Sequence, residues 1–438
     1  MPEKKSVKKV LEDLKQEIRS SQNTLIVGID IGKFRHCACF AASSGKVLRR
    51  KFFFINTIDG FNNLIRQTKY YQKKNNLPKV IFGMEPSGSY WFHLYEFLEL
   101  SGKKAVTVSP LAVRRNRETI NVSKDKTDPK DAHNITDLVG QGKFYLPVYR
   151  DKEIRQLKRL MQLYYRLIRQ RASLRCRLRG VVGYVFPELE HYFTDITAKS
   201  MILILEKAPF PEKIRKMGKS RFISFLAKNN PYLGRRRAEE IFKLAPSSVG
   251  IRGEEEATSL EINLLLRELR SINENVALIN VQVSRIVKTR EDYGLLLTIR
   301  GVGPITAASL IAEIGDITNF SSGKQLIKLA GLDLYGLESG ISIHSQRKIS
   351  KRGRKTLRTV VYQAAVGCVR CNAHLKACYL EFLSHQPNKK KIKPKALVAI
   401  ASKLLRIVFR MLTEKKGFDA NYDEMLRETF ALRAHKAA

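Results

Sequence analysis

Residues 24–108 carry short apolar segments separated by turn residues, a pattern typical of strands that alternate with helices. The pattern predicts strands at 24–30, 37–42, 47–55, 79–84 and 105–108. It predicts helices from Thr57 or Asp59 to about Tyr71, at 89–101, and from Asp128, where Asp caps the helix and Pro takes its first position. Three successive strands followed by strand–helix alternation indicate an α/β fold on one mixed sheet.

Long amphipathic helices replace this pattern after about residue 150. Residues 155–179 keep apolar residues at helical spacing and contain nine basic residues and no acidic residue. A second long helix is expected at about 259–288, with nine apolar residues at the same spacing. The two helices are candidates for a coiled coil, either within one chain or between chains. No function is assigned to residues 181–255 between them.

The C-terminal part is expected to form a compact, mainly helical unit that begins at residue 292. A basic break at 385–395 precedes a last apolar helix at 396–411. Residues 1–20 are expected to form a basic amphipathic helix or a loose arm. The predicted domains are a basic arm at 1–23, an α/β domain at 24–150, a helical connector with an insertion at 151–291, a C-terminal domain at 292–412 and a polar tail at 413–438.

The net charge of the chain indicates which kind of partner it binds. The 438 residues include 80 Lys and Arg against 41 Asp and Glu, a net charge of +39. Such self-repulsion favours a polyanionic partner, with nucleic acid the first candidate and an acidic membrane surface the second. Six scattered cysteines and a charged N-terminus without a signal core favour the cytoplasm, in association with the nucleoid. No apolar run approaches the ~18 residues of a membrane span, so no membrane partner is expected.

Four carboxylates form the first candidate site. Asp30 and Glu85 end predicted strands, and Asp128 and Asp131 lie three residues apart on the first turn of a predicted helix, where both face one side. Acids at adjacent strand ends and at a helix start can converge on one point. Hard oxygen ligands suit Mg²⁺ or Mn²⁺, and two such ions assist phosphodiester chemistry. The alternative is four ordinary surface acids, two of them at a helix start.

Two further motifs are suited to phosphate binding. Gly301 and Gly303 form a Gly-x-Gly turn between two predicted helices, where free backbone N–H groups can bind phosphate, as in a helix-hairpin-helix element. A plain helix–helix turn is the alternative. Residues 347–358 hold seven basic residues and no acid, which predicts a phosphate-binding stripe. Its members are Arg347, Lys348, Lys351, Arg352, Arg354, Lys355 and Arg358.

Ser339 precedes a glycine in a stretch poor in helix-forming residues, beside this basic stripe. An activated loop serine could attack a phosphodiester, although a Ser-Gly pair is more often a turn. Ser342, Ser345 and Ser350 are equally suitable by composition. The set Cys368, Cys371, His374 and Cys378 has zinc-like spacing. Because these four residues fall in what is expected to be one continuous helix, buried thiols on an apolar face are the favoured interpretation.

The motifs, taken in order, resemble the DEDD-type insertion-sequence transposases. The N-terminal set is G-I-D-I-G-K, M-E-P-S-G-S-Y-W and K-T-D-P-K-D-A. The stretch from I-R-G-V-G-P through A-G-L and E-S-G to I-S-K-R-G-R-K-T-L-R resembles the C-terminal transposase domain of that family, and K-P-K-A-L-V-A-I-A-S-K-L-L matches its last helix. The resemblance covers residues 24–150 and 292–412, and the middle matches only as a helical, coiled-coil connector.

The resemblance implies a fold and a set of residue roles. The N-terminal domain would be similar to RuvC, a Holliday-junction resolvase with an RNase H-like fold, and the mainly α C-terminal domain would hold the helix-hairpin-helix-like element. Asp30, Glu85, Asp128 and Asp131 would be the metal-binding tetrad, and Ser339 the nucleophile that forms a covalent link to DNA. In this family both are thought to form one composite site, and a non-coding RNA from the element guides the choice of donor and target DNA.

Three classes of function are therefore compared. The favoured class is a DNA recombinase of a mobile element that exchanges strands through a serine–DNA intermediate, as a homodimer or homotetramer that holds two duplexes. A RuvC-like junction-resolving nuclease would use metal-activated water and form no adduct. A non-catalytic nucleic-acid-binding scaffold would satisfy the charge but would leave four acids beside a phosphate-binding surface unexplained.

Overall fold

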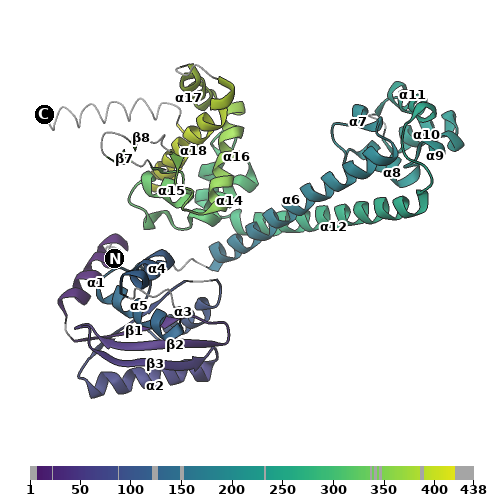
Figure 1. Ribbon diagram of the computed structural model, residues 1–438. Helices are drawn as coiled ribbons and strands as arrows, with labels where there is room; N and C mark the ends of the chain where they lie inside the picture. Colours follow the sequence, from purple (N-terminus) through teal and green to yellow (C-terminus); the bar gives the residue numbers. More distant parts are fainter. Residues whose placement is uncertain are drawn as a thin grey trace. The chain divides into compact units, whose positions relative to one another are not determined.

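The computed structural model describes residues 7–21, 23–86, 88–120, 127–147, 152–230, 233–335, 338–339, 343–344, 348–384 and 389–419. The chain divides into two compact units, Met1–Tyr149 with Thr318–Ser321, and Arg150–Ile317 with Ser322–Ala438. Figure 1 shows a sheet with helices in the first unit and helices almost throughout the second. A mixed sheet with helices, followed by a mostly helical region, agrees with the predicted fold class.

The sheet of the first unit has the strand order β3-β2-β1-β4-β5. Its strands are β1 (Thr24–Asp30), β2 (Arg35–Ala42), β3 (Val47–Ile55), β4 (Lys79–Met84) and β5 (Ala105–Thr107). The first three strands form an antiparallel meander, and β4 and β5 run parallel to β1. The five predicted strands are confirmed. β1, β2 and β4 are apolar runs that lie largely in the core, whereas β3 is buried only at Phe52 and Phe54.

Alternate side chains of the strands point to opposite faces of the sheet, and each face has its own hydrophobic core. The core on one face includes Val27, Phe40 and Phe82, and α2 (Ile58–Lys74) and α3 (Trp91–Leu100) cover it. The core on the other face includes Ile26 and Ile81. It is covered by α1 (Val7–Ser20), α4 (Pro110–Ile120) and α5 (Asp128–Gly140).

Two helices of this second face differ from the prediction. The pattern of apolar positions does not predict α4, because its sequence PLAVRRNRETI has too few apolar residues. The predicted cap of α5 is wrong by one residue, since Thr127 is the N-cap and Asp128 is already helical. Thr127 takes an extended conformation, and its carbonyl accepts hydrogen bonds from the N–H groups of Lys130 and Asp131. The helical alternative for the N-terminal segment is confirmed, because α1 packs on the sheet through Ile18, which is 3% exposed.

The second unit begins with two long helices, α6 (Lys152–Val185) and α12 (Glu255–Val287), which pack side by side (Figure 1). Six short elements fold at their far end and share a hydrophobic core with both helices. These are α7 (Leu189–Tyr192), α8 (Lys199–Lys207), α9 (Pro211–Met217), α10 (Lys219–Asn229), α11 (Arg235–Leu244) and the 3-10 helix η2 (Ala245–Ser247). The predicted insertion is therefore a small helical subdomain at the tip of a helical hairpin.

The C-terminal part of this unit surrounds the buried helix α14 (Pro304–Ile314). Its other helices are α13 (Glu291–Leu297), α15 (Gly323–Ala330), α16 (Lys355–Cys371), α17 (Ala373–Ser384) and α18 (Lys389–Glu414). The 3-10 helix η3 (Ile317–Asn319) begins in this unit and ends in the first. Two small sheets pair β6 (Leu334–Tyr335) with β9 (Lys348–Ile349), and β7 (Glu338–Ser339) with β8 (Ile343–His344). The hairpin is fastened to α14, because the hydroxyls of Tyr165 and Ser309 lie 3.1 Å apart and Lys158 Nζ lies 3.8 Å from Glu313.

Two predictions for this region need correction. The continuous helix expected through Cys368, Cys371, His374 and Cys378 is interrupted at Asn372, which leaves the helical conformation. The Asn372 side-chain oxygen accepts a hydrogen bond from the N–H of Leu375 at 3.1 Å and starts a new helix. Cys368 is buried, which raises the pKa of its thiol to about 12, whereas Cys371 is exposed. The predicted basic break is shorter than expected, since α18 begins at Lys389 and continues through Pro394.

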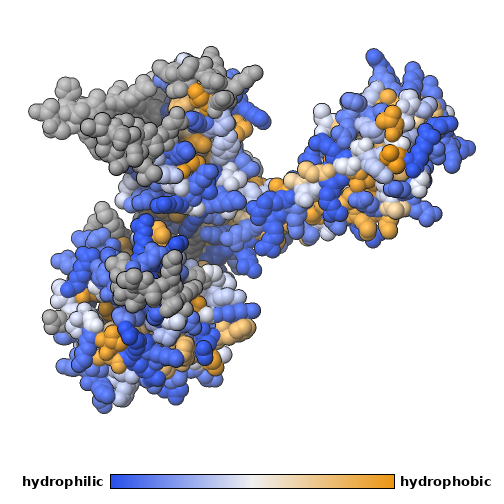
Figure 2. Space-filling model, viewed as in Figure 1, coloured by the Kyte–Doolittle hydropathy of each residue, from blue (hydrophilic) through white to orange (hydrophobic). Residues whose placement is uncertain are grey.

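The visible surface is mainly hydrophilic, with small separate hydrophobic patches (Figure 2). Within the described ranges, no helix is long and apolar enough to cross a bilayer.

The first unit depends on the absence of a side chain at Gly28. A Cβ atom there would overlap the Thr136 hydroxyl and the Ala132 carbonyl oxygen of α5. We expect Gly28→Ala to lower the free energy of unfolding of this unit by about 1–3 kcal/mol, because α5 must move away from β1. Gly140→Ala is a matched control, since its Cβ would lie 3.5 Å from Ile26 in ordinary contact. Chemical denaturation followed by circular dichroism measures both, and equal stabilities would refute this packing argument.

Candidate active site

Asp30 and Glu85 lie at the carboxyl ends of adjacent parallel strands. Gly28 pairs with Gly83 and Ile29 with Met84, so the next residue of each chain segment is a carboxylate. Both acids are partly exposed. By the alternation of side chains they share the face of Gly28 and Gly83, which is the face that α5 covers. The structure therefore places these two predicted site residues at one edge and on one face of the sheet.

Helix α5 brings the second pair of acids to this edge. Its residues Ala132 and Thr136 lie against Gly28, and Gly140 lies near Ile26, so α5 runs antiparallel to β1. The first turn of α5, with Asp128 and Asp131, therefore faces the end of the sheet where Asp30 lies. This placement follows from close backbone packing, because neither Gly28 nor Gly83 has a side chain to hold the helix away.

The charges of two of these carboxylates affect the pKa of the Cys37 thiol. Cys37 is the register partner of Asp30 on β2 and is 1% exposed. Burial raises the pKa of the Cys37 thiol to about 11, and the negative charges of Asp128 and Asp30 contribute to this rise. Asp30 and Asp128 thus come close enough from two elements to act on the same atom. The thiol stays protonated near neutral pH and adds no charge to the cluster.

Asp131 is buried and paired with an arginine. Its side chain is 3% exposed, and its Oδ1 accepts from Arg117 Nε at 2.9 Å and lies 2.6 Å from Arg117 Nη2. A second contact holds α4 and α5 together, since the Asn116 amide of α4 donates a hydrogen bond to Asp137 of α5 at 2.9 Å. Sequence reasoning missed Arg117, because it lies on α4, which the hydrophobic pattern does not predict.

The donor chemistry of the four acids suits a divalent metal ion, but their present arrangement does not complete a site. Among the described residues, no group of three His, Cys, Asp or Glu side chains is placed to hold one ion. The Arg117 guanidinium pairs with Asp131 and neutralises its carboxylate. The acids converge on one edge of the sheet, while one of the four is held by a protein cation.

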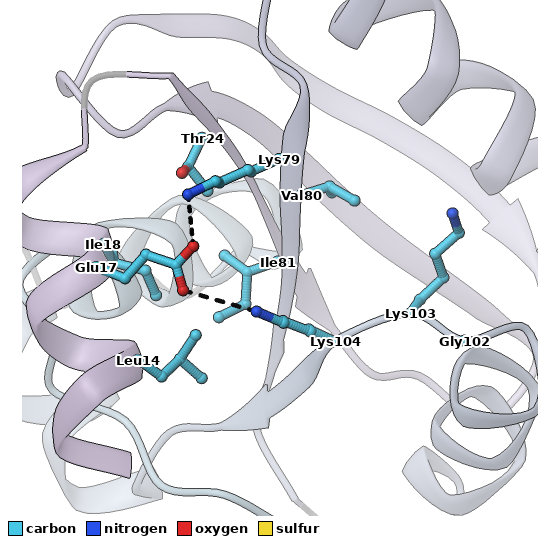
Figure 3. A pocket seen from close by; sticks show the side chains of 10 residues that line it. All are labelled: Leu14, Glu17, Ile18, Thr24, Lys79, Val80, Ile81, Gly102, Lys103 and Lys104. Carbon is cyan, nitrogen blue, oxygen red and sulfur yellow. Dashed lines mark hydrogen bonds and ion pairs between the residues drawn. The ribbon is translucent and has the colours of Figure 1, made fainter. Parts of the chain in front are cut away.

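A pocket elsewhere in this unit is not part of the candidate site. It has a volume of about 260 Å³ and lies between α1 and the starting ends of β1 and β4, near Thr24 and Lys79 (Figure 3). Glu17 accepts a hydrogen bond from Lys79 at 2.7 Å, which lowers the pKa of Glu17, and lies 3.6 Å from Lys104. The acids lie at the other ends of the same strands. The pocket residues therefore fasten α1 to the sheet.

The predicted nucleophile, Ser339, and the Gly-x-Gly turn lie in the second unit. Ser339 is in the short strand β7, with Ile343 as its register partner, rather than in a loop. Gly301 has a φ of 100°, and a Cβ there would lie 2.5 Å from the backbone of Gly367 and Cys368 in α16. This close packing and the positive φ therefore require glycine at position 301. Gly303 is the exposed N-cap of α14.

The predicted basic stripe divides into exposed and occupied side chains. Lys348, Lys351, Arg352 and Lys355 are exposed. Arg354 is instead partly buried; its guanidinium donates to the Glu313 carbonyl and lies 3.9 Å from the Glu313 carboxylate. Arg358 donates to the Ala330 carbonyl at 2.9 Å. Both arginines have structural partners, a role that sequence charge alone does not reveal. Arg347 lies outside the described residues, as do Ser342 and Ser345.

Ser350, the remaining alternative serine, is engaged in a turn. Its hydroxyl donates to Asp333 Oδ1 at 2.5 Å and accepts from the Arg352 N–H at 3.3 Å. These contacts fix the segment that follows β9.

Comparison with known proteins gives a consistent result. Residues 27–187 match a family model of DEDD-type transposases, and residues 293–380 match a model of the IS116/IS110/IS902 transposase family. Together the two matches cover more than half of the chain.

Curated relatives extend this likeness over most of the chain. The insertion element IS116 protein of Streptomyces clavuligerus is 23% identical, over 90% of this chain and 95% of its own length. The transposase for insertion sequence IS1111A of Coxiella burnetii is 23% identical, over 92% and 94%. The pilin gene-inverting protein of Moraxella bovis is 28% identical over 45% of this chain and 65% of its own length. With the acids of its motifs gathered at one edge of an α/β sheet, this chain belongs to the DEDD-type insertion-element transposases.

Proposed function

We propose that this protein cuts and rejoins DNA strands of a mobile element, with the four carboxylates and Ser339 as its reactive groups. The observation that carries the proposal is the meeting of Asp30 and Glu85 on the sheet face that α5 covers. The strand order, with an antiparallel meander followed by two parallel strands, supports an RNase H-like fold. The Moraxella relative, whose name describes gene inversion, supports a recombination reaction rather than simple cleavage.

The family assignment implies a divalent metal ion, and we propose Mg²⁺ or Mn²⁺ because the donors are carboxylate oxygens. Asp30, Glu85 and Asp128 would hold it, and Asp131 would join them once Arg117 releases its carboxylate. The chemistry supplied at these residues when an ion is bound would be neutralisation of the phosphate and stabilisation of the leaving oxygen. The protein's own contribution is the fixed edge of the sheet, which sets the spacing of the acids before any ion arrives.

Ser339 supplies the nucleophile in this proposal. Its hydroxyl oxygen forms a bond to phosphorus and loses its proton, while the bond from phosphorus to one DNA oxygen breaks and that oxygen gains a proton. A hydroxyl of another strand then attacks the phosphoserine ester and restores the serine. One phosphodiester bond is thereby replaced by another. Strand exchange therefore needs no external energy source.

The partners follow from charge and from exposed apolar residues. The exposed lysines and arginine of the basic stripe favour donor and target DNA. Helix α12 exposes Leu260, Leu264, Leu278 and Val281 at helical spacing, which favours a coiled-coil contact with a second copy. The guide RNA implied by the resemblance is part of the same proposal. Sequencing of RNA that copurifies with the protein tests it, since no structured RNA from beside the gene should appear if the proposal is wrong.

Asp128→Asn should abolish strand exchange while leaving DNA affinity within about twofold, because it removes a proposed metal ligand without removing a phosphate contact. Gel assays of recombined products and filter binding measure the two properties. Asp137→Asn is the matched control, since Asp137 lies on the same helix but is held by Asn116 and Gln141. Normal strand exchange by Asp128→Asn would rule out this carboxylate as a catalytic group.

Ser339→Ala should prevent formation of a covalent protein–DNA adduct, detected as a slowly migrating labelled band after denaturation. Ser345→Ala is the control and should still form the adduct. Cleavage without any adduct in the unchanged protein would favour the junction-resolving nuclease, in which water attacks the phosphate.

Arg117→Gln should lower the melting temperature of the first unit in chelator-treated buffer. Removing one partner of a buried ion pair leaves a buried charge uncompensated, which costs about 3–5 kcal/mol. Added Mn²⁺ should restore more stability to this variant than to the unchanged protein, because the freed Asp131 then binds the ion. Arg114→Gln is the control, since its pair with Glu118 is exposed and worth about 0.2–1 kcal/mol. An equal Mn²⁺ effect in all three proteins would exclude Asp131 as a ligand.

A further inference from the structure

The turn that follows Asp30 presents an aromatic side chain to solvent. Phe34 is 75% exposed, the largest exposure of any aromatic residue among the exposed apolar side chains of the described ranges. It lies four residues from Asp30, so the two Cα atoms are at most about 14 Å apart. Phe34 has no role in the core, and its exposure has a hydrophobic cost.

The backbone of this turn is held firmly from two sides. The N–H of Asn56 donates to the Phe34 carbonyl at 2.9 Å, and the Asn56 side-chain amide donates to the Lys33 carbonyl at 3.2 Å. The N–H of Gly32 donates to Nδ1 of the buried His36 at 3.2 Å. Phe34 is thus presented on an ordered turn, which lowers the entropy that a partner must overcome on contact.

One cation lies beside Phe34, and two others lie beside Phe53 on β3. Lys33 Nζ lies 4.8 Å from the centre of the Phe34 ring. Phe53 follows Asp30 and Cys37 in one row of register partners across β1, β2 and β3, about 10 Å from Asp30 at the usual strand spacing. Arg35 and Lys51 lie 4.1 Å and 5.1 Å from the Phe53 ring centre. A positive aromatic surface therefore adjoins the acids.

Exposed rings also lie where the loop after Glu85 enters α3. Tyr90, the N-cap of α3, is 37% exposed, and Phe92, in the first turn of α3, is 45% exposed. This loop leaves β4 at the same edge of the sheet at which Phe34 follows β1. Exposed rings thus follow both strands that end in a carboxylate.

We propose that Phe34, with Lys33 beside it, is a stacking platform for an unpaired base of the DNA strand, and that Arg35 and Lys51, which lie over Phe53, bind the backbone of that strand. The inference rests on the proposed function and names the form of substrate that this edge accepts. The ring stacks on a base of any identity, while the cations bind the flanking phosphates. A neutral ring is suited to this position because the neighbouring acids repel phosphate. Bases inside an intact duplex cannot reach the ring, so the strand must be locally unpaired.

The test uses the full-length protein and a single-stranded DNA oligonucleotide that contains 2-aminopurine, whose fluorescence falls on stacking. Phe34→Ala should weaken single-strand affinity about tenfold and abolish the fluorescence change, whereas Phe34→Trp should retain both. Affinity for an intact duplex should not change, since phosphate contacts dominate it. Leu100→Ala is the matched control, because Leu100 is an 85% exposed apolar residue at the far end of α3.

Three outcomes would overturn the platform. Equal single-strand affinity of Phe34→Ala and the unchanged protein would show that no base stacks there. A change in sedimentation of the variant, with DNA affinity unchanged, would identify a contact between copies instead. A loss of affinity for an RNA oligonucleotide alone would refute the assignment to DNA. Because the assay measures binding without cleavage, the platform can stand even if Asp128→Asn shows that the proposed reaction is wrong.

Discussion

The contact between α5 and the bare backbone of β1 and β4 determines the geometry of the first unit. Gly28 and Gly83 let the helix approach closer than any side chain would permit, and the Thr136 hydroxyl reaches the Cys39 carbonyl at 3.4 Å. The direction of α5 and its depth on the sheet are therefore fixed together. A larger residue at either glycine would move the start of the helix away from the strand ends, and with it half of the acidic residues.

A strongly basic protein stabilises its few internal acids with its own cations. Asp131 is paired with Arg117, and Glu313, 4% exposed, lies between Lys158 and Arg354. Both arrangements follow from the cost of an unpaired buried charge. They differ in consequence, because Glu313 joins three helices of the second unit, whereas Asp131 lies at the edge where the other acids gather. The same type of ion pair thus stabilises the structure in one place and engages a proposed metal ligand in the other.

Sequence patterns predicted the sheet well and the ion pairs not at all. Strands β1 and β2 are apolar runs bounded by turn residues, so local sequence and burial agree. Helix α4 was not predictable because its apolar side is narrow, and its pairing with α5 arises only in three dimensions. Similarly, seven basic residues in one stretch predicted one stripe, although Arg354 turns into the protein toward Glu313. The break at Asn372 was missed because apolar spacing continues across it.

The helical hairpin of the second unit has a mechanical consequence. Its base is fastened to α14 near Tyr165 and Lys158, and beyond Tyr165 helix α6 continues for about 20 residues, roughly 30 Å at 1.5 Å per residue. A rotation of about 10° at the base would move the tip subdomain through about 5 Å. A small repacking of Ser309 or Glu313 against α6 would therefore be amplified along the hairpin into a displacement of several ångströms at its tip.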